Sequence, residues 1–376
     1  MRYAAIFILL IALLGGAYWY VQKGAAPAEV MGEPIATATS SQSGVTEVAA
    51  VTVIAQDLEI PWDIAFLPEG GMLVTERNAH VIFIAENGQK KEIAVDGVSK
   101  NGEGGLLGIV LHPNFPQNHL LYLYMSSAGG EGETQNRVVR YRYEGGELHQ
   151  DKIIITGIPG AIYHDGGRME FGPDGMLYIT TGDATRSNIA QDKKSLGGKT
   201  LRLKDDGSIP ADNPFGTVVW SYGHRNAQGI AWDSAGRMWQ TEHGRSGVTS
   251  GMDEINLVVK AGNYGWPTIE GDKTKEGMIT PVKNSGANDT WAPASLVYLD
   301  GSLFFGGLRG TALYQAVLDG ERVVEFKEHF KGVYGRIRTV RIGPDGMLYL
   351  TTSNRDDRGT PKEGDDKIIR VDPKKL

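Results

Sequence analysis

Five short clusters in the sequence combine glycine with acidic, basic or amide side chains. Glycine lets a backbone approach a bound molecule closely. Histidine and carboxylate groups move protons or bind cations. The clusters occupy residues 164–168, 222–229, 242–245, 253–256 and 262–267. They are candidates for one ligand-binding or active site, provided that the fold brings them together.

A repeated hairpin motif predicts the fold that would do so. Three clear copies contain a Pro-Asp-Gly or Pro-Glu-Gly turn, in which proline presets φ and glycine supplies a positive φ. These copies lie at residues 64–75, 169–180 and 340–351, and weaker copies at residues 107–124, 230–239 and 296–305. Six copies are typical of propeller blades. We therefore expect an all-β, six-bladed β-propeller. A large β-sandwich is the alternative, but it would not repeat one hairpin six times.

A propeller gathers loops from every blade around one end of its axis, so distant parts of the sequence can share one site. The longer intervals, between the second and fifth copies, must contain long loops. Long loops on a rigid scaffold commonly carry binding or catalytic residues.

The composition excludes several classes of protein. The chain has 376 residues, a net charge of −7 and no cysteine. Nucleic-acid binding would require a basic stripe, so no nucleic-acid partner is expected. The absence of cysteine excludes disulfides, thiolate metal sites and cysteine nucleophiles. The sequence contains no Gly-rich βαβ unit of the kind that binds NAD, so NAD is not the expected cofactor.

The N-terminus has the pattern of an export signal. A short start containing Arg2 precedes an apolar run over residues 4–21, which is also long enough for a membrane span. We expect residues 1–23 to be a signal peptide or membrane anchor, and the sequence leaves both open. Residues 24–47 are expected to be a flexible linker, and residues 48–376 the propeller domain. The protein is then exported, on the periplasmic or extracellular face.

The site motifs resemble the glucose/sorbosone dehydrogenase family, the soluble quinoproteins that use pyrroloquinoline quinone (PQQ). The resemblance runs from about Pro61 to the C-terminus and is closer to the compact aldose sugar dehydrogenases. It rests on Gly-His-Arg-Asn-x-Gln-Gly at 223–229, Asp-Glu-Ile-Asn at 253–256, Asn-Tyr-Gly-Trp-Pro at 263–267, Gly-Gly-Leu-Leu-Gly at 104–108 and His-x-x-Gly-Arg at 164–168.

The resemblance implies oxidation of an aldose at C1, with hydride passing to the quinone. His164 matches the family's general base, and an imidazole suits that task near neutral pH. Arg225 matches the residue that stabilises charge on the quinone oxygen, with Asn226 beside it. The plain alternative for Arg225 is a surface ion pair.

The resemblance also implies two Ca²⁺ sites. The carbonyls of Gly244 and Arg245 match those that bind the cofactor's Ca²⁺, although the soluble glucose enzyme has proline at the second position. Carbonyl oxygens are suitable ligands for this cation. Glu254 and the Tyr264 carbonyl match a second, structural site. The alternative there is a carboxylate that simply caps a turn.

Cations are expected around the three PQQ carboxylates. Arg336 and Arg338 match a family arginine pair, and strand alternation places them on one face. Arg309 stands where the family has lysine, which keeps the charge but changes its shape. Glu103 stands where the soluble glucose enzyme has glutamine. An ionised carboxylate beside the quinone would oppose the negative charge that forms there during hydride transfer. We therefore expect Glu103 either to hold a proton or to pair with a nearby cation.

Two other functions remain open at this point. A Ca²⁺-dependent propeller lactonase or hydrolase would gather side-chain carboxylates and asparagine around its metal. A non-catalytic propeller that binds protein or carbohydrate would not require His164, Arg225 and the arginine pair together. The partners expected for the dehydrogenase are an aldose and an external electron acceptor.

Overall fold

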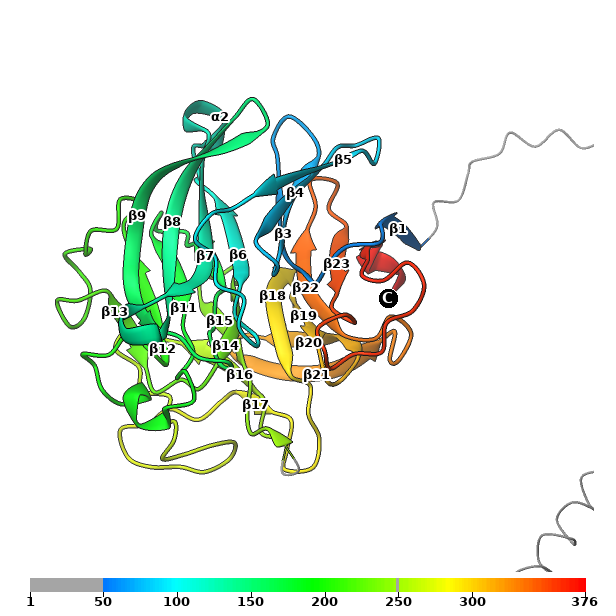
Figure 1. Ribbon diagram of the computed structural model, residues 1–376. Helices are drawn as coiled ribbons and strands as arrows, with labels where there is room; N and C mark the ends of the chain where they lie inside the picture. The colour runs from blue at the N-terminus through cyan, green and yellow to red at the C-terminus, as the bar shows by residue number, and fades with distance from the viewer. Residues whose placement is uncertain (1–49, 248–249) are drawn as a thin grey trace, which may run out of the picture. The chain divides into compact units, whose positions relative to one another are not determined.

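The computed structural model describes residues 50–247 and 250–376, which form six antiparallel four-stranded sheets (Figure 1). The expected signal or anchor, residues 1–23, and the expected linker, residues 24–47, lie outside the described residues. Within the described ranges, no helix has the length and apolarity that crossing a membrane requires.

Each sheet is one blade, and five blades use four consecutive strands. The first two blades comprise β2 (Pro61–Phe66), β3 (Met72–Glu76), β4 (His80–Ile84) and β5 (Lys90–Ala94), then β6 (Leu106–Leu111), β7 (Leu120–Ala128), β8 (Thr134–Glu144) and β9 (Glu147–Pro159). The third and fourth comprise β10 (Met169–Phe171), β11 (Leu177–Thr180), β12 (Lys199–Leu203) and β13 (Val219–Tyr222), then β14 (Ala227–Trp232), β15 (Met238–Glu242), β16 (Glu254–Val258) and β17 (Lys283–Asn284).

The fifth blade comprises β18 (Pro293–Leu299), β19 (Ser302–Gly307), β20 (Ala312–Asp319) and β21 (Arg322–His329). The sixth comprises β22 (Ile337–Ile342), β23 (Leu348–Thr352), β24 (Ile368–Val371) and β1 (Val51–Ala55). The helical segments within residues 50–247 and 250–376 are short, and they include α2 (Phe115–Asn118) and the 3₁₀ turns Gly130–Gly132, Ser187–Ala190 and Pro373–Lys375.

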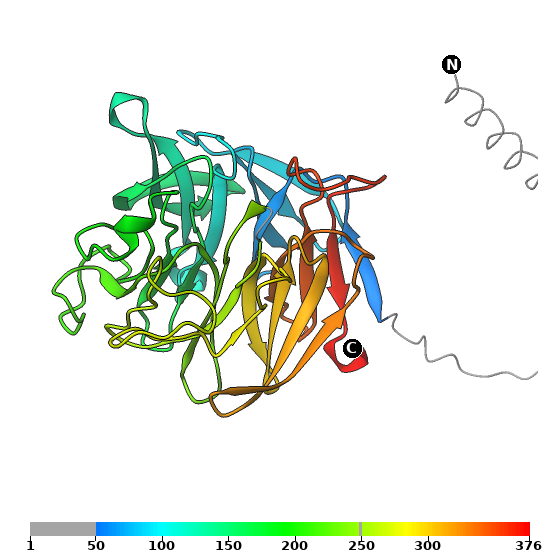
Figure 2. The ribbon, with the colours of Figure 1, turned by 90° about the horizontal axis from the view of Figure 1, so that it is seen from below.

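The blades close into a ring. The first strands β2, β6, β10, β14, β18 and β22 contact one another in this order, and β22 contacts β2 again. The sixth blade takes its outermost strand from the other end of the chain, with Val51 opposite Val371. Figures 1 and 2 show the blue β1 beside the red C-terminal segment. Pairing between strands from the two ends of the described chain thus completes the sixth blade and closes the ring.

All six predicted hairpins are the first two strands of a blade. The longer turn expected within residues 107–124 contains the short helix α2. This correspondence confirms the six-bladed propeller and excludes the β-sandwich.

The turn chemistry explains why the repeat recurs. In the third blade, Gly175 has a φ of +74°, as the sequence predicts for this turn. Asp174 accepts a hydrogen bond from the Met176 N–H (3.1 Å) and another from the Tyr178 hydroxyl (3.0 Å). Asp345 makes the equivalent pair of bonds in the sixth blade. The aspartate therefore closes the turn and fixes the aromatic residue of the second strand.

The apolar core lies between neighbouring blades. Leu73 of the first blade is fully buried in one cluster with Leu106 and Leu123 of the second. Leu313 of the fifth blade packs in the same way with Val340 of the sixth. Because each interface joins two blades, the ring holds its inter-blade loops in fixed positions.

The centre of the ring contains charged rather than apolar side chains. Asp63 on β2 lies 2.6 Å from Arg168 Nη1 and 2.8 Å from Arg341 Nη2, and Arg341 also pairs with Glu170. We call these four residues the axial cluster. The exposed fractions of Asp63 and Arg168 are 0% and 1%, so the innermost strands are joined by buried charges.

Candidate active site

One cavity of about 680 Å³ is surrounded by two kinds of loop. The first kind leads into a blade, and the second joins the second and third strands of a blade. The residues predicted for the site that line this cavity are Glu103, His164, Asn226, Gly244, Arg245, Arg309, Arg336 and Arg338. The propeller therefore brings together residues from widely separated parts of the sequence.

The His164 ring is oriented by Asp183, which Trp266 holds in turn. Its Nδ1 lies 2.8 Å from Asp183 Oδ1, and Asp183 Oδ2 accepts a hydrogen bond from Trp266 Nε1 (2.8 Å). Burial alone would raise the pKa of Asp183, but the hydrogen bond and charge of His164 and the bond from Trp266 lower it. An ionised carboxylate only accepts hydrogen bonds. Nδ1 therefore carries a hydrogen, so in a neutral His164 ring Nε2 is the nitrogen that can accept a proton.

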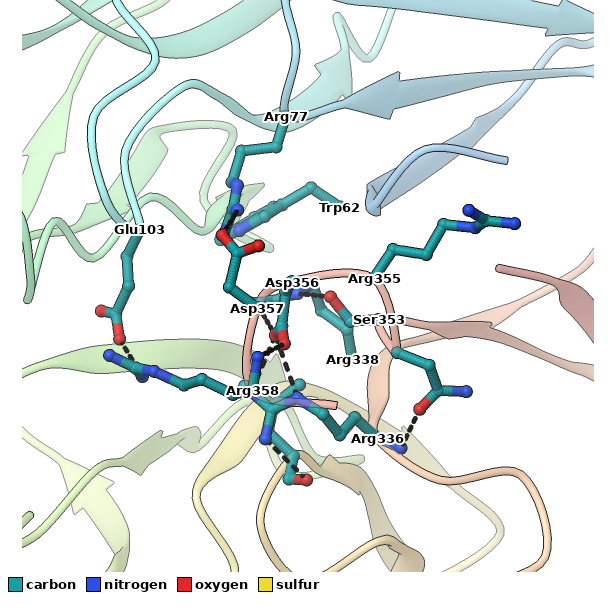
Figure 3. Close-up of polar contacts among 12 residues, drawn as sticks. Trp62, Arg77, Glu103, Arg336, Arg338, Ser353, Arg355, Asp356, Asp357 and Arg358 are labelled. Atoms are coloured by element: carbon teal, nitrogen blue, oxygen red, sulfur yellow. Dashed lines mark hydrogen bonds and ion pairs between the residues drawn. The ribbon is translucent and has the colours of Figure 1, made fainter. Parts of the chain in front are cut away.

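The arginine pair shares one carboxylate. Arg336 donates to Asp356 Oδ2 from Nε (3.0 Å) and Nη2 (2.7 Å), and Arg338 donates to the same oxygen (3.4 Å) (Figure 3). Arg338 is also bonded to Ser353 (3.1 Å). Burial lowers the pKa of Arg338 to about 10, so it stays charged at neutral pH. Both arginines are held on the same side of the cavity.

Glu103 is paired with a cation, which is the second of the two alternatives derived from the sequence. Its Oε1 accepts a hydrogen bond from Arg358, and its Oε2 accepts one from the His164 N–H (3.2 Å). Arg309, by contrast, is exposed and donates to the Gly247 carbonyl (3.3 Å). Arg309 is thus the less constrained of the predicted cations.

Arg225 and Asn226 lie differently from each other. Asn226 lines the cavity and accepts a hydrogen bond from the Gly166 N–H (3.0 Å). Arg225 is buried, and its guanidinium donates to the His243 carbonyl (3.3 Å) and the Ser246 hydroxyl (3.0 Å). Arg225 is therefore not among the described residues that line the cavity, but its guanidinium contacts Ser246, which is. Its burial argues against the surface ion pair of the plain alternative.

Asp253 ties the expected metal loop to its neighbours. Its Oδ1 accepts from the Gly244 N–H (2.8 Å), and its Oδ2 accepts from the N–H groups of Trp291 (2.7 Å) and Ala292 (2.9 Å). The Arg245 carbonyl accepts longer bonds from the Gly251 N–H (3.3 Å) and the Ser250 hydroxyl (3.2 Å).

Glu254 and Tyr264 lie away from the cavity lining. Burial, together with the neighbouring Glu242 carboxylate, raises the pKa of Glu254 to about 8. Glu254 accepts hydrogen bonds from Asn256 (3.1 Å) and the Gly271 N–H (3.2 Å), while Asn256 Oδ1 is buried without a hydrogen-bond partner in the described structure. Tyr264 stacks on His224, with ring centroids 4.6 Å apart.

The cavity has several donors to offer an anionic molecule. Arg77 Nε is buried, belongs to a lining residue and has no hydrogen-bond partner among the described residues. Arg245 Nε is also without a hydrogen bond but lies 3.6 Å from Glu270 Oε2, and His243 Nε2 can donate in one of its two neutral tautomers. Buried donors are normally satisfied. Together with Arg309, they fit a ligand that carries several carboxylates.

A family model described as Glucose / Sorbosone dehydrogenase matches residues 58–360. The chain belongs to this family. An aldose sugar dehydrogenase of Escherichia coli (strain K12) is 32% identical over 364 residues, which cover 86% of this chain and 93% of that protein. The quinoprotein glucose dehydrogenase B of Acinetobacter calcoaceticus is 33% identical over 274 residues, 63% of this chain and 56% of that protein.

Solved structures agree with the assignment to the glucose/sorbosone dehydrogenase family. A PQQ-bound aldose sugar dehydrogenase from Streptomyces coelicolor has a TM-score of 0.79 at 41% identity, covering 85% of this chain and 97% of that one. The predicted resemblance and the predicted enzyme class, a sugar oxidoreductase, are therefore confirmed.

Four residues of this dehydrogenase's site were missed from the sequence: Arg77, Asp183, Asp356 and Arg358. All four lie in loops between the second and third strands of a blade. A signal for them exists, because in each of these blades charged residues follow shortly after a second strand that ends in or near threonine. The loop containing His243 has the same position in the fourth blade.

Proposed function

We propose that the chain is a PQQ- and Ca²⁺-dependent aldose dehydrogenase that oxidises its sugar at C1 to the lactone. One observation carries the proposal: His164, which is hydrogen-bonded to Asp183, lines a cavity that six arginines also line. The proton acceptor and the groups that would hold an anionic cofactor thus belong to one cavity.

His164 would act as the general base. Its Nδ1 is engaged by Asp183, so Nε2 is free to take the proton of the C1 hydroxyl. Asp183 then stabilises the imidazolium that forms. Bound PQQ would supply the acceptor for the hydride from C1. The arginines would hold its carboxylates, with Arg309 and Arg77 the least occupied by protein partners.

The residues near Gly244 are compatible with a Ca²⁺ ion. Asp253 fixes the Gly244 N–H, and the Arg245 carbonyl is engaged only by bonds of 3.2 and 3.3 Å in the described structure. The second expected site consists of Glu254 and the Tyr264 carbonyl. Asn256 Oδ1, which is unpartnered in the described structure, supports it, because carboxylate, carbonyl and amide oxygens are ligands that Ca²⁺ prefers.

The alternatives receive less support. A metal-dependent hydrolase would gather carboxylates, and no group of three or more His, Asp or Glu side chains in the described ranges is arranged to hold a metal ion. A binding module would not need an aspartate-oriented histidine beside cations. The aldose, the external acceptor and export of the enzyme, free or anchored, belong to this proposal.

Reconstitution is the direct test of the proposed function. Purified chain should reduce a dye with aldoses only after both PQQ and Ca²⁺ are added, because the cavity supplies a base and cations but no hydride acceptor. Isothermal titration should show PQQ binding at micromolar concentrations. NAD-linked turnover, or no PQQ binding, would contradict the proposal, and lactone hydrolysis would favour the hydrolase.

Calcium removal should lower stability through Glu254. At a Ca²⁺ concentration 100 times the dissociation constant, binding to the folded state stabilises it by about 2.7 kcal/mol. In cofactor-free protein, which lacks the Ca²⁺ that accompanies PQQ, we expect a chelator to lower the melting temperature by several degrees, and Glu254→Gln to abolish most of that difference. Glu276→Gln, at an exposed carboxylate in the same region, is the matched control. An equal chelator effect in Glu254→Gln and wild type would place the ion elsewhere.

A further inference from the structure

Glu103 contacts the loop of the proposed base in two ways. Its own N–H donates to the Ile162 carbonyl (2.9 Å), and its Oε2 accepts from the His164 N–H (3.2 Å). Gly102 makes this approach possible, because a Cβ there would lie 2.2 Å from the Ile162 carbonyl oxygen. The loop before β6 therefore lies directly against the loop before β10.

His164 needs such support. Its φ is +66°, a left-handed conformation that costs free energy for any residue other than glycine. Residues held in this region persist when their surroundings fix them. The side chain is fixed by Asp183, whereas Glu103 accepts the hydrogen bond from the backbone N–H of the same residue.

Glu103 is itself fixed by Arg358, which comes from the sixth blade (Figure 3). The Arg358 guanidinium also lies over the Tyr163 ring, with its Cζ 5.1 Å from the ring centroid. Tyr163 immediately precedes His164, so Arg358 contacts both Glu103 and the His164 loop. The side chains of Glu103 and Arg358 are 25% and 50% exposed, and both line the cavity.

We propose that Glu103 is a positioning residue for His164 and that Arg358 acts through Glu103 and Tyr163. This inference rests on the proposed function, in which His164 is the base. The pair joins loops of the second, third and sixth blades at the point where Nε2 must meet the C1 hydroxyl. A small displacement of a reacting group lowers turnover strongly. Pairing with Arg358 also neutralises a carboxylate that would otherwise oppose negative charge on the cofactor.

Three variants separate the contributions. Glu103→Ala removes both the acceptor and the charge, whereas Glu103→Gln keeps an oxygen that can accept from the His164 N–H. Arg358→Gln removes the counter-ion and the guanidinium that lies over Tyr163, but keeps the Glu103 carboxylate. Glu325→Gln is the matched control, because Glu325 forms a similarly exposed ion pair with Lys327 on β21, outside the cavity.

Two readouts are needed, and the first requires no cofactor. Hydrogen exchange of the His164 amide, measured by NMR on cofactor-free protein, should be roughly tenfold faster in Glu103→Ala and unchanged in Glu103→Gln and in the control. In reconstituted enzyme, kcat should fall roughly tenfold in Glu103→Ala and less in Glu103→Gln and Arg358→Gln, with KM little changed.

The double variant Glu103→Ala/Arg358→Gln should lose less activity than the two single losses multiplied together, because both residues act on one loop. Wild-type amide exchange and kcat in Glu103→Ala would overturn the inference, as would additive losses. If Glu103→Ala fails to fold, a full kcat in both Glu103→Gln and Arg358→Gln overturns it instead. If wild type shows no aldose oxidation, the proposed function fails, while amide exchange still tests whether Glu103 holds the His164 backbone.

Discussion

Replacing His164 with alanine should lower turnover by at least roughly 10²-fold, because general-base catalysis by a positioned side chain is worth about 10²- to 10⁴-fold. Nε2 is the ring nitrogen that the Asp183 contact leaves available to accept a proton. Stopped-flow reduction of the reconstituted enzyme by saturating aldose would measure the step. PQQ binding should persist, since the arginines that would hold the carboxylates are unchanged.

Asp183→Asn tests the same arrangement from the other side. The variant keeps the size of the side chain but removes the charge that orients Nδ1 and stabilises an imidazolium, so kcat should fall as well. His149→Ala, at an exposed histidine on β9, is the control and should retain wild-type turnover. Full activity in His164→Ala would move the base to another residue.

The fold could be predicted because its information is local. A Pro-Asp-Gly turn between two short strands specifies a hairpin, and Asp174 and Gly175 do in the structure what their types require. Pairing of β1 with β24 was not predictable in this way. Nothing local to residues 51–55 indicates a partner more than 300 residues away, and only ring closure supplies it.

The site could be predicted only in part, for a related reason. Motifs identified His164 and the Arg336–Arg338 pair, because their types and order match a family. The partners Asp183 and Arg358 depend on which loops the ring places side by side. Arg225 shows a second limit of prediction from sequence. Its motif identifies the residue but not its contacts, and its guanidinium donates to the His243 carbonyl and the Ser246 hydroxyl.

The axial cluster should give the largest loss of stability. Asp63→Asn removes the carboxylate that Arg168 and Arg341 share, and leaves the fully buried Arg168 without its ion-pair partner in the described structure. Breaking a buried pair by removing one partner typically costs about 3–5 kcal/mol. The free energy of unfolding, measured in urea at neutral pH, should fall by this amount. Asp319→Asn, in an exposed pair with Arg322, should cost about 0–1 kcal/mol.

The pH dependence identifies the carboxylate itself. Burial alone would raise the pKa of Asp63, but Arg168 and Arg341 lower it below its ordinary value. A depressed folded-state pKa contributes stability that is present above the unfolded value, about 3.9, and is lost as the pH falls through the folded value. The difference in unfolding free energy between wild type and Asp63→Asn should therefore be constant near neutrality and shrink below about pH 4. A difference that is small at pH 7, or that does not shrink in acid, would mean that the axial charges do not hold the innermost strands together.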